Sequence, residues 1–149
     1  PLGVYNHPVN KFVAGFIGSP SMNFLTGVLQ KVDSHLVVDF GPFLINVPRH
    51  FHQTALPHLG KKITLGIRPE HIYADESTFR GSLKSQPIEA FVDVYEPLGS
   101  DVILELLADG CSFVAQVDSD TRVRSQQNIK VYFDEEKIHL FDFKTDQVI

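Results

Sequence analysis

Hydrophobic and polar side chains alternate with a period of two along most of the chain after Leu25. Successive side chains of a β-strand point to opposite faces of the sheet, so this alternation indicates half-buried strands. The pattern predicts about nine or ten short strands in all. The segments that carry it are Thr26–Val32, Leu36–Asp39, Phe43–Val47, Ile63–Ile67, Ala90–Val94, Val102–Leu106, Cys111–Val117, Ile129–Phe133 and Lys137–Phe141.

Residues that favour turns separate these segments. Asp109–Gly110 is the strongest hairpin signal, because both residue types tolerate the positive φ of a two-residue turn. Many short strands at this spacing predict a mainly β fold, built as a small barrel or sandwich. Between the strands we expect a loop with a short helical turn at Pro48–Gly60, a long connection at Asp75–Pro87 and a tight turn at Glu96–Ser100.

One segment near the amino end has a helical period instead. Five apolar residues fall at i, i+3, i+4, i+7 and i+8, which places them on one face of a helix at about residues 8 to 17. Pro8 suits the first turn of that helix, and Gly18 followed by Pro20 favours its end. A helix this short is marginal alone in water, so its apolar face needs a surface to cover. That face is Val9, Phe12, Val13, Phe16 and Ile17.

The composition excludes several classes of protein. With 43% hydrophobic and 21% charged residues, the chain has the composition of an ordinary globular domain. No apolar run approaches the ~18 residues that a membrane-spanning helix needs, and no signal peptide is expected. A single cysteine, Cys111, excludes an internal disulfide and suits a reducing compartment.

Charge is distributed unevenly between the two halves. Residues 1 to 74 hold six Lys/Arg and three Asp/Glu, whereas residues 75 to 149 hold seven Lys/Arg and fifteen Asp/Glu. Nucleic-acid affinity depends mainly on cations that neutralise phosphates, so an acidic chain without a basic cluster is poorly suited to it. The asymmetry fits either a solvated acidic face or a contact between unlike surfaces.

No catalytic motif is found in the sequence. A P-loop requires G-x-x-x-x-G-K-[ST], and Gly60-Lys61-Lys62 lacks both the earlier glycine and the hydroxyl residue. Cys111 has the parity of the apolar side chains in its strand, which favours a core position over a nucleophile. We therefore expect no nucleotide hydrolysis and no other catalysis by this chain.

Metal binding has two weak candidates. His50, His52 and His58 fall in one loop, but their spacing supplies no fourth zinc ligand. Asp118 and Asp120 are spaced like the start of a calcium loop, but the required glycine and final glutamate are missing. A surface loop and a turn between strands explain these residues better, so we predict no metal site.

Two short motifs admit both a structural and a contact role. Within IRPEH, Pro69 removes a backbone donor and favours a strand end, where Arg68 and Glu70 would secure a barrel rim or form a contact site. EPLGS, at Glu96 to Ser100, is similarly a tight turn or a recognition loop.

Four blocks in order give the chain a family resemblance. They are FVAGFIGSPSMNF at Phe12 to Phe24, GIRPEH at Gly66 to His71, EPLG at Glu96 to Gly99, and YFDEEKIHLFD at Tyr132 to Asp142. Together they resemble the C-terminal part of ATP-binding subunits of carbohydrate-uptake ABC importers of the maltose and glycerol-3-phosphate type. That part is the TOBE, or transport-associated OB, domain. The first six residues, PLGVYN, are similar to a segment that follows the ATPase motifs, although Gly3 departs from the usual acidic residue.

The resemblance implies a domain division and a function. Residues 1–24 would be the C-terminal edge of an ATPase domain with a linker, and residues 25–149 an OB-like regulatory domain. This domain would hold two ATP-binding subunits together as a homodimer without catalysing a reaction. Its contact residues would come from the motifs: Arg68, Pro69, Glu70, His71, Glu96 and Gly99.

The same resemblance implies partners that lie outside this chain. They are the chain's own ATPase domain, transmembrane permease subunits and a regulatory protein. ATP and magnesium would bind to the full-length parent and not to this part of it. The implied location is cytoplasmic, on the inner face of the cell membrane through the transporter complex.

Two other functions compete with this one. Related TOBE modules of molybdate importers bind the oxyanion between barrels, and Lys61-Lys62 with several serines would suit an anion. OB folds also bind single-stranded nucleic acid on stacking aromatics in a positive groove. The acidic second half makes such a groove hard to build, so the sequence predicts no nucleic-acid partner.

Overall fold

The computed structural model describes Asn10, Lys11 and residues 20–149, and it is built mainly from β-strands. Its ten strands confirm the predicted mainly β fold and the predicted number of strands. They are β1 (Asn23–Val32), β2 (His35–Asp39), β3 (Leu44–Asn46), β4 (Lys62–Ile67), β5 (Ile72–Tyr73), β6 (Ile88–Leu98), β7 (Asp101–Ala108), β8 (Cys111–Asp118), β9 (Asn128–Phe133) and β10 (His139–Asp142).

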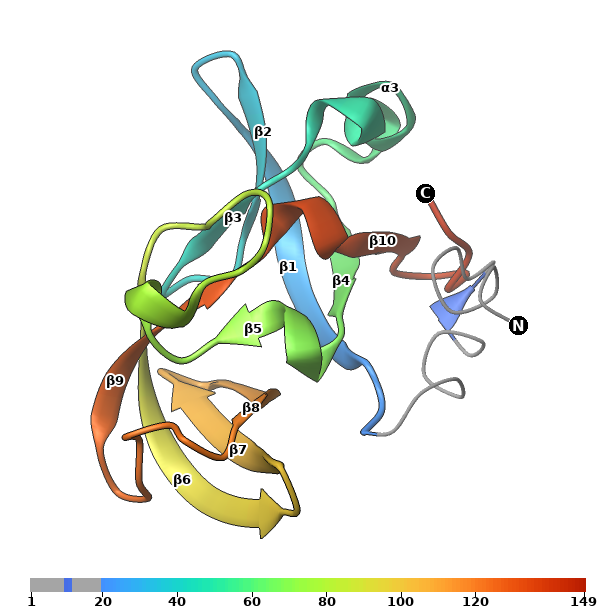
Figure 1. Ribbon diagram of the computed structural model, residues 1–149. Helices are drawn as coiled ribbons and strands as arrows, with labels where there is room; N and C mark the ends of the chain where they lie inside the picture. The colour runs from blue at the N-terminus through green and yellow to red at the C-terminus, as the bar shows by residue number, and fades with distance from the viewer. Residues whose placement is uncertain (1–9, 12–19) are drawn as a thin grey trace.

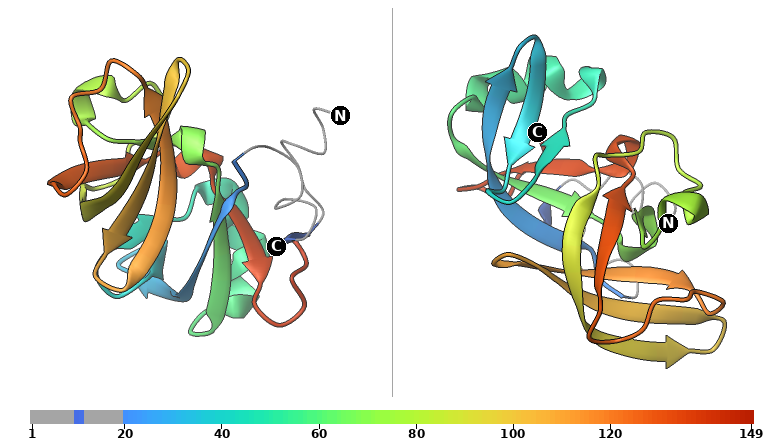
Figure 2. Two further views of the ribbon diagram at one scale, coloured as in Figure 1. Left: turned by 90° about the horizontal axis from the view of Figure 1, so that it is seen from below. Right: turned by 90° about the vertical axis from the view of Figure 1, so that its left-hand side faces the viewer.

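The strands form two five-stranded antiparallel sheets (Figure 1). The first sheet has the order β10-β4-β1-β2-β3, and the second has the order β5-β9-β6-β7-β8. The chain crosses from the first sheet to the second between β4 and β5, and it returns between β9 and β10. Figure 2 shows the β6–β7–β8 meander packed beside the first sheet, with the β1–β2 hairpin extending away from it.

The predicted alternation explains how the two sheets share a core. In β7, Val102, Leu104 and Leu106 are at most 1% exposed, while the residues between them face outward. Similar inward-facing residues from both sheets belong to one contiguous hydrophobic cluster. Gly27 allows the close approach of β1 and β2, because a Cβ there would lie 2.6 Å from Val38 Cγ1 and 2.9 Å from the Asp39 carbonyl oxygen.

The predicted turns are largely found. Asp109 and Gly110 both have positive φ and connect β7 to β8 in the expected two-residue turn. Asp33 also has positive φ and lies in the β1–β2 turn. The prediction of a tight turn over Glu96–Ser100 was wrong in extent, since Glu96, Pro97 and Leu98 extend β6 and only Gly99–Ser100 turn.

Helical structure differs more from the expectation. The loop predicted at Pro48–Gly60 consists largely of η1 (Arg49–Phe51), α3 (His52–Ala55) and η2 (Leu56–His58), anchored by the fully buried Ala55. Three further short 3₁₀ segments are η3 (Pro69–His71), η4 (Glu76–Thr78) and η5 (Glu135–Lys137). Lys137 therefore belongs to η5, and β10 begins two residues later than predicted. The two-residue strand β5 is too short to show a period and was not predicted.

Several expectations fall on residues that the structure does not describe. The predicted helix at residues 8 to 17, with its apolar face of Val9, Phe12, Val13, Phe16 and Ile17, lies almost wholly outside the described residues. Of that stretch, the structure places Asn10 and Lys11 beside the C-terminal residues: the Lys11 N–H donates to the Asp146 carbonyl at 3.0 Å, and Asn10 bridges to Gln147. Among the described helices, none is long and apolar enough to cross a membrane.

Candidate functional site

Three of the four sequence blocks meet where the chain passes between the two sheets. We call residues 68–71 and 134–138 the sheet junction, because they are the two crossing segments. The segments lie side by side: the Asp134 N–H donates to the His71 carbonyl at 3.0 Å, and Ile72 pairs with Phe133. The GIRPEH and YFDEEKIHLFD blocks therefore form one structural unit.

The GIRPEH residues at this junction differ in their access to solvent. Arg68 is 1% exposed and Pro69 is buried at the start of η3, which contacts β8. Glu70 is exposed and His71 is half-buried. Of these four predicted contact residues, only Glu70 is exposed, and the buried Arg68 and Pro69 offer no surface to a partner in this structure.

His71 is the titratable group most affected by the junction. Burial lowers its pKa below the ordinary value; the nearby Glu70 and Asp134 carboxylates oppose this shift, whereas Lys137 and Arg68 add to it. Its Nδ1 atom is buried and makes no hydrogen bond to the described residues. The environment thus favours the neutral imidazole.

The lowered pKa of His71 predicts a pH dependence of stability. A group whose pKa is lower in the folded state stabilises the fold above its unfolded pKa, about 6.5, and loses that contribution as pH falls through the folded value. We expect urea unfolding to show a smaller free energy at pH 5.5 than at pH 7.5, and His71→Gln to reduce this difference. Identical pH slopes for wild type and variant would contradict the assignment.

Asp134 connects three parts of the chain through its carboxylate. It is 1% exposed and accepts hydrogen bonds from the backbone N–H groups of Ser82 and Leu83, each at 3.1 Å. It also accepts the Glu136 N–H at 3.1 Å, which caps η5. One side chain thereby holds the 81–83 loop against the junction.

Glu135 makes a second connection, to the edge of the first sheet. This residue is 5% exposed, and its carboxylate accepts the Asn46 N–H of β3 at 2.8 Å and the Asn46 side chain at 3.5 Å. Burial raises the pKa of Glu135, and the Asn46 hydrogen bonds offset part of that increase. The run Asp134-Glu135-Glu136 therefore contains two buried carboxylates, although from sequence it resembles an exposed charged turn.

Asn23 joins the first strand to the edge of the second sheet. Its side chain accepts the Val114 N–H at 2.8 Å and donates to the Val114 carbonyl at 2.8 Å, as a neighbouring strand would. It also donates to the Ile67 carbonyl at 3.2 Å. This buried amide pairs with backbone groups of β8 that face away from β7, and it lies in the first sequence block.

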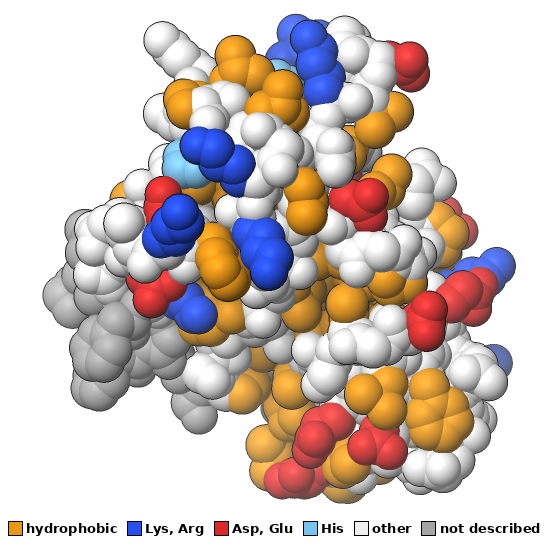
Figure 3. Space-filling view, turned by 180° about the vertical axis from the view of Figure 1, so that it is seen from behind, with side chains coloured by type: hydrophobic (Ala, Val, Ile, Leu, Met, Phe, Trp, Pro, Cys, Tyr) orange, Lys and Arg blue, Asp and Glu red, His pale blue; other side chains and the backbone are white. Residues whose placement is uncertain are grey.

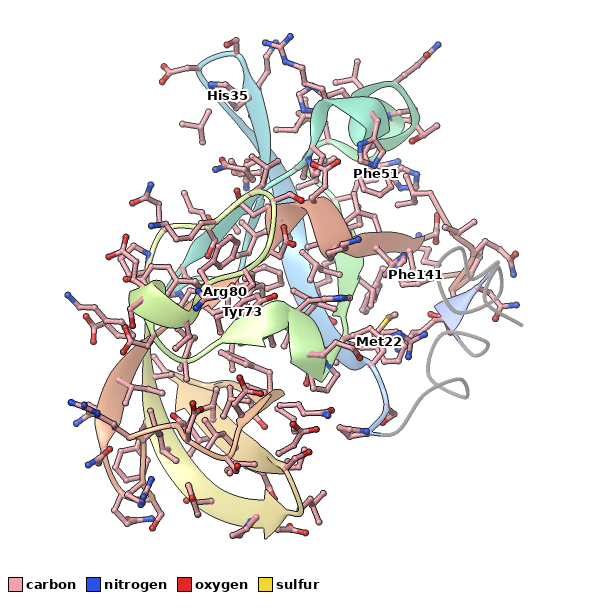
Figure 4. All side chains as sticks on the ribbon, in the orientation of Figure 1. Met22, His35, Phe51, Tyr73, Arg80 and Phe141 are labelled. Atoms are coloured by element: carbon pink, nitrogen blue, oxygen red, sulfur yellow. The ribbon has the colours of Figure 1, made fainter. Side chains whose placement is uncertain are left out.

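A small hydrophobic cluster lies beside Asn23 and again unites the blocks. Met22 and Phe141 are buried together, with Phe24 packed against them, and Figure 4 shows the labelled pair adjacent at the start of β1. A Cβ on Gly66 would lie 2.6 Å from Met22 Sδ and 3.0 Å from Phe141 Cε2. The glycine of GIRPEH thus makes room for side chains from the first and last blocks.

The remaining predicted residues lie elsewhere. Glu96 is in the last part of β6 and Gly99 in the β6–β7 turn, where both are exposed. Figure 1 places that turn at the far end of the hairpin, well away from η3. The structure therefore does not combine Glu96 and Gly99 with Arg68, Pro69, Glu70 and His71 into one site.

The histidines and the cysteine that were considered as metal ligands or as a nucleophile make contacts within the fold. His52 Nε2 lies 2.9 Å from the Val47 carbonyl oxygen, and His58 Nδ1 lies 3.8 Å from Asp142 Oδ2. Within the described part of the chain, no three His, Cys, Asp or Glu side chains are grouped as a metal site would require. Cys111 is partly buried against the core, and burial raises the pKa of its thiol, which disfavours a nucleophilic thiolate.

Comparison with known proteins assigns this arrangement to a family. The family model of the MalK OB fold domain matches residues 18–72, and the family model of the TOBE domain matches residues 65–141. The chain belongs to the TOBE-domain family. These two matches meet at the sheet junction, and they confirm the OB-like fold that the sequence predicted.

Relatives with known names place the domain within longer proteins. It is 39% identical to the trehalose/maltose import ATP-binding protein MalK of Thermococcus litoralis, over all of this chain and 40% of that protein. It is 36% identical to the oligosaccharides import ATP-binding protein MsmX of Bacillus subtilis, over 98% of this chain and 39% of that protein. The TOBE domain thus spans about two fifths of these relatives and corresponds to their C-terminal region.

A solved structure shows a similar fold in another setting. The molybdate-bound form of the cytoplasmic molybdate-binding protein ModG has a TM-score of 0.58 to this TOBE domain, with 14% sequence identity. The likeness covers 79% of this chain and 94% of ModG. At that identity it supports the fold alone and carries no inference about an oxyanion site.

Proposed function

We propose that this chain is the C-terminal regulatory and dimerisation domain of the ATP-binding subunit of an ABC importer for sugars or related solutes. The observation that carries the proposal is the 36–39% identity, over essentially the whole chain, to the ATP-binding proteins of a trehalose/maltose importer and an oligosaccharide importer. Residues 1–24 would then connect to the ATPase domain, and residues 25–149 would be the regulatory domain. The ATP, magnesium and permease subunits would belong to the assembled transporter, on the cytoplasmic face of the membrane.

The described structure supports a role through contacts. Its buried polar side chains, Asp134, Glu135 and Asn23, bond to backbone groups and join segments that are far apart in the sequence. These residues are therefore used for stability, and no catalytic grouping is formed from them. Glu96 and Gly99, two exposed residues of the motifs, lie where a partner protein can reach them.

Self-association tests the dimerisation part of the proposal. We expect sedimentation velocity of the purified chain to show a reversible dimer that becomes more populated as concentration rises from micromolar to about millimolar, since small domain contacts are of modest affinity. Calorimetry with ATP and Mg²⁺ on the same purified chain tests for a nucleotide site and should show no binding heat. A monomer at every concentration would contradict dimerisation, and ATP binding would contradict the absence of a nucleotide site.

Oxyanion binding is the alternative to separate from this function. Titration with molybdate, tungstate and sulfate under the same conditions provides that separation. The proposal predicts no saturable heat with any of them. Stoichiometric binding of molybdate would favour an oxyanion sensor instead.

A further inference from the structure

The solvent-facing side of the second sheet carries an apolar surface. We define this outer face by the β6–β7–β8 residues whose side chains point away from the core. Leu98 and Leu107 on it are 53% and 42% exposed. Phe91 of β6 pairs with Leu107 of β7, and Ile103 lies on the same face of β7 as Leu107. Phe91 and Ile103 are half-buried. An antiparallel sheet whose second face is only solvated would carry mainly polar residues there.

The β6–β7–β8 segment that forms this outer face carries charge of one sign, and the neighbouring strand β9 places Lys130 opposite Glu89 at its edge. From Ser85 to Thr121 the sequence contains eight Asp or Glu residues and no Lys, Arg or His. Glu96 pairs with Ile103 and Glu105 pairs with Val94, so two of these carboxylates lie on the apolar face itself. Figure 3 shows the lower part of the molecule, where the meander lies, with hydrophobic and acidic side chains together and no basic ones among them.

The charge decides which occupant fits. A symmetric homodimer through this face would place the same surface on both subunits, and so Glu96 and Glu105 of one copy would lie near the same carboxylates of the other. Like charges brought together across an interface disfavour the homodimer. The same carboxylates disfavour binding of anionic lipid or nucleic acid. A face on which carboxylates lie among apolar side chains instead complements a protein surface on which basic side chains lie among apolar ones.

We propose that the outer face of β6–β7–β8 is a docking surface for a separate protein that presents lysine or arginine side chains among apolar ones. The inference rests on the proposed function, because it names the kind of partner a regulatory domain would take. It also places the dimer contact elsewhere on the molecule. Glu96 and Leu98, both from the EPLG block, contribute to the surface, while Gly99 shapes the adjacent turn.

A peptide probe tests this surface directly. The ¹⁵N-labelled chain is titrated with a twelve-residue peptide of alternating lysine and leucine, and with a matched peptide carrying glutamate in place of lysine. We expect shifts of the amide signals on β6–β8 with the lysine peptide only. We also expect at least tenfold weaker binding when salt is raised from about 50 to about 500 mM, because salt screens exposed charges.

Variants determine whether the effect belongs to this face. Glu96→Lys with Glu105→Lys should weaken the lysine peptide at least fivefold, and Leu98→Ser with Leu107→Ser should weaken it as much. The control Glu136→Lys reverses an exposed carboxylate outside the meander and should leave binding within twofold of wild type. Shifts that map elsewhere, equal binding of both peptides, or no effect of either double variant would overturn the proposal.

Sedimentation of the same variants distinguishes this inference from the proposed function. Both double variants should self-associate like the wild type if the dimer forms through another face. Loss of self-association in Leu98→Ser with Leu107→Ser would make the outer face the dimer contact and overturn the docking proposal. A monomeric wild type that still binds the lysine peptide on β6–β8 would contradict dimerisation but support the docking surface.

Discussion

Replacing Asp134 by alanine is expected to lower the free energy of unfolding by about 3–5 kcal/mol. Its carboxylate accepts three backbone N–H groups, from Ser82, Leu83 and Glu136, and the side chain itself is almost fully buried. Removing the acceptor leaves three partly buried donors unpaired, at about 1–3 kcal/mol each for a buried group, and the losses are not additive. Urea unfolding monitored by circular dichroism measures the effect, and Asp134→Asn should lose less because one acceptor oxygen remains.

Asp142 supplies a matched control for this prediction. Its carboxylate also accepts two backbone N–H groups, those of Lys144 and Thr145, but its side chain is 31% exposed and reaches solvent. Water can replace the lost acceptor there, so Asp142→Ala should have a much smaller effect. Equal losses for Asp134→Ala and Asp142→Ala would show that the buried junction does not depend on Asp134.

The second large effect is expected at Asn23. Alanine at this position would remove the two hydrogen bonds to Val114 that join β1 to β8 and the one to Ile67 of β4, for a loss of about 3 kcal/mol. Because Val114 would lose a partner for both backbone groups, its amide should also exchange with solvent faster. Gln30→Ala, at an exposed position of the same strand, is the control and should change stability by less than about 1 kcal/mol. Unchanged exchange at Val114 would contradict the assigned role of Asn23.

The sequence predicted the strands well because their signal is local. Alternation in β7 and β8 reports which side chains face the core, and Asp109–Gly110 reports the turn between them. The two-residue strand β5 has no period of its own, since its pairing with β9 depends on residues sixty positions away. The helical stretch after Pro48 is similarly anchored by tertiary burial of Ala55.

The roles of the motif residues were much less accessible from sequence. IRPEH suggested a barrel rim, but Arg68 is buried, and η3, which holds the partly buried His71, packs against β8, about forty residues later. Asp134-Glu135-Glu136 carries the composition of an exposed turn, and its partners at Ser82 and Asn46 are 52 and 89 residues distant. Asn23 resembles any polar residue before a strand. Hydrogen bonds between such distant positions leave no periodic signal in one sequence.

The central proposal is that this domain serves the ATP-binding subunit of a sugar importer, and a domain exchange tests it most directly. The C-terminal region of Bacillus subtilis MsmX would be replaced by this chain, with ModG in the same place as the control that shares only the fold. Import of labelled oligosaccharide by cells carrying each chimera is then measured at equal protein levels. We predict that this chain supports import and that ModG does not. If both chimeras bind ATP and the chimera with this chain imports no more oligosaccharide than the chimera with ModG, the proposed function is contradicted.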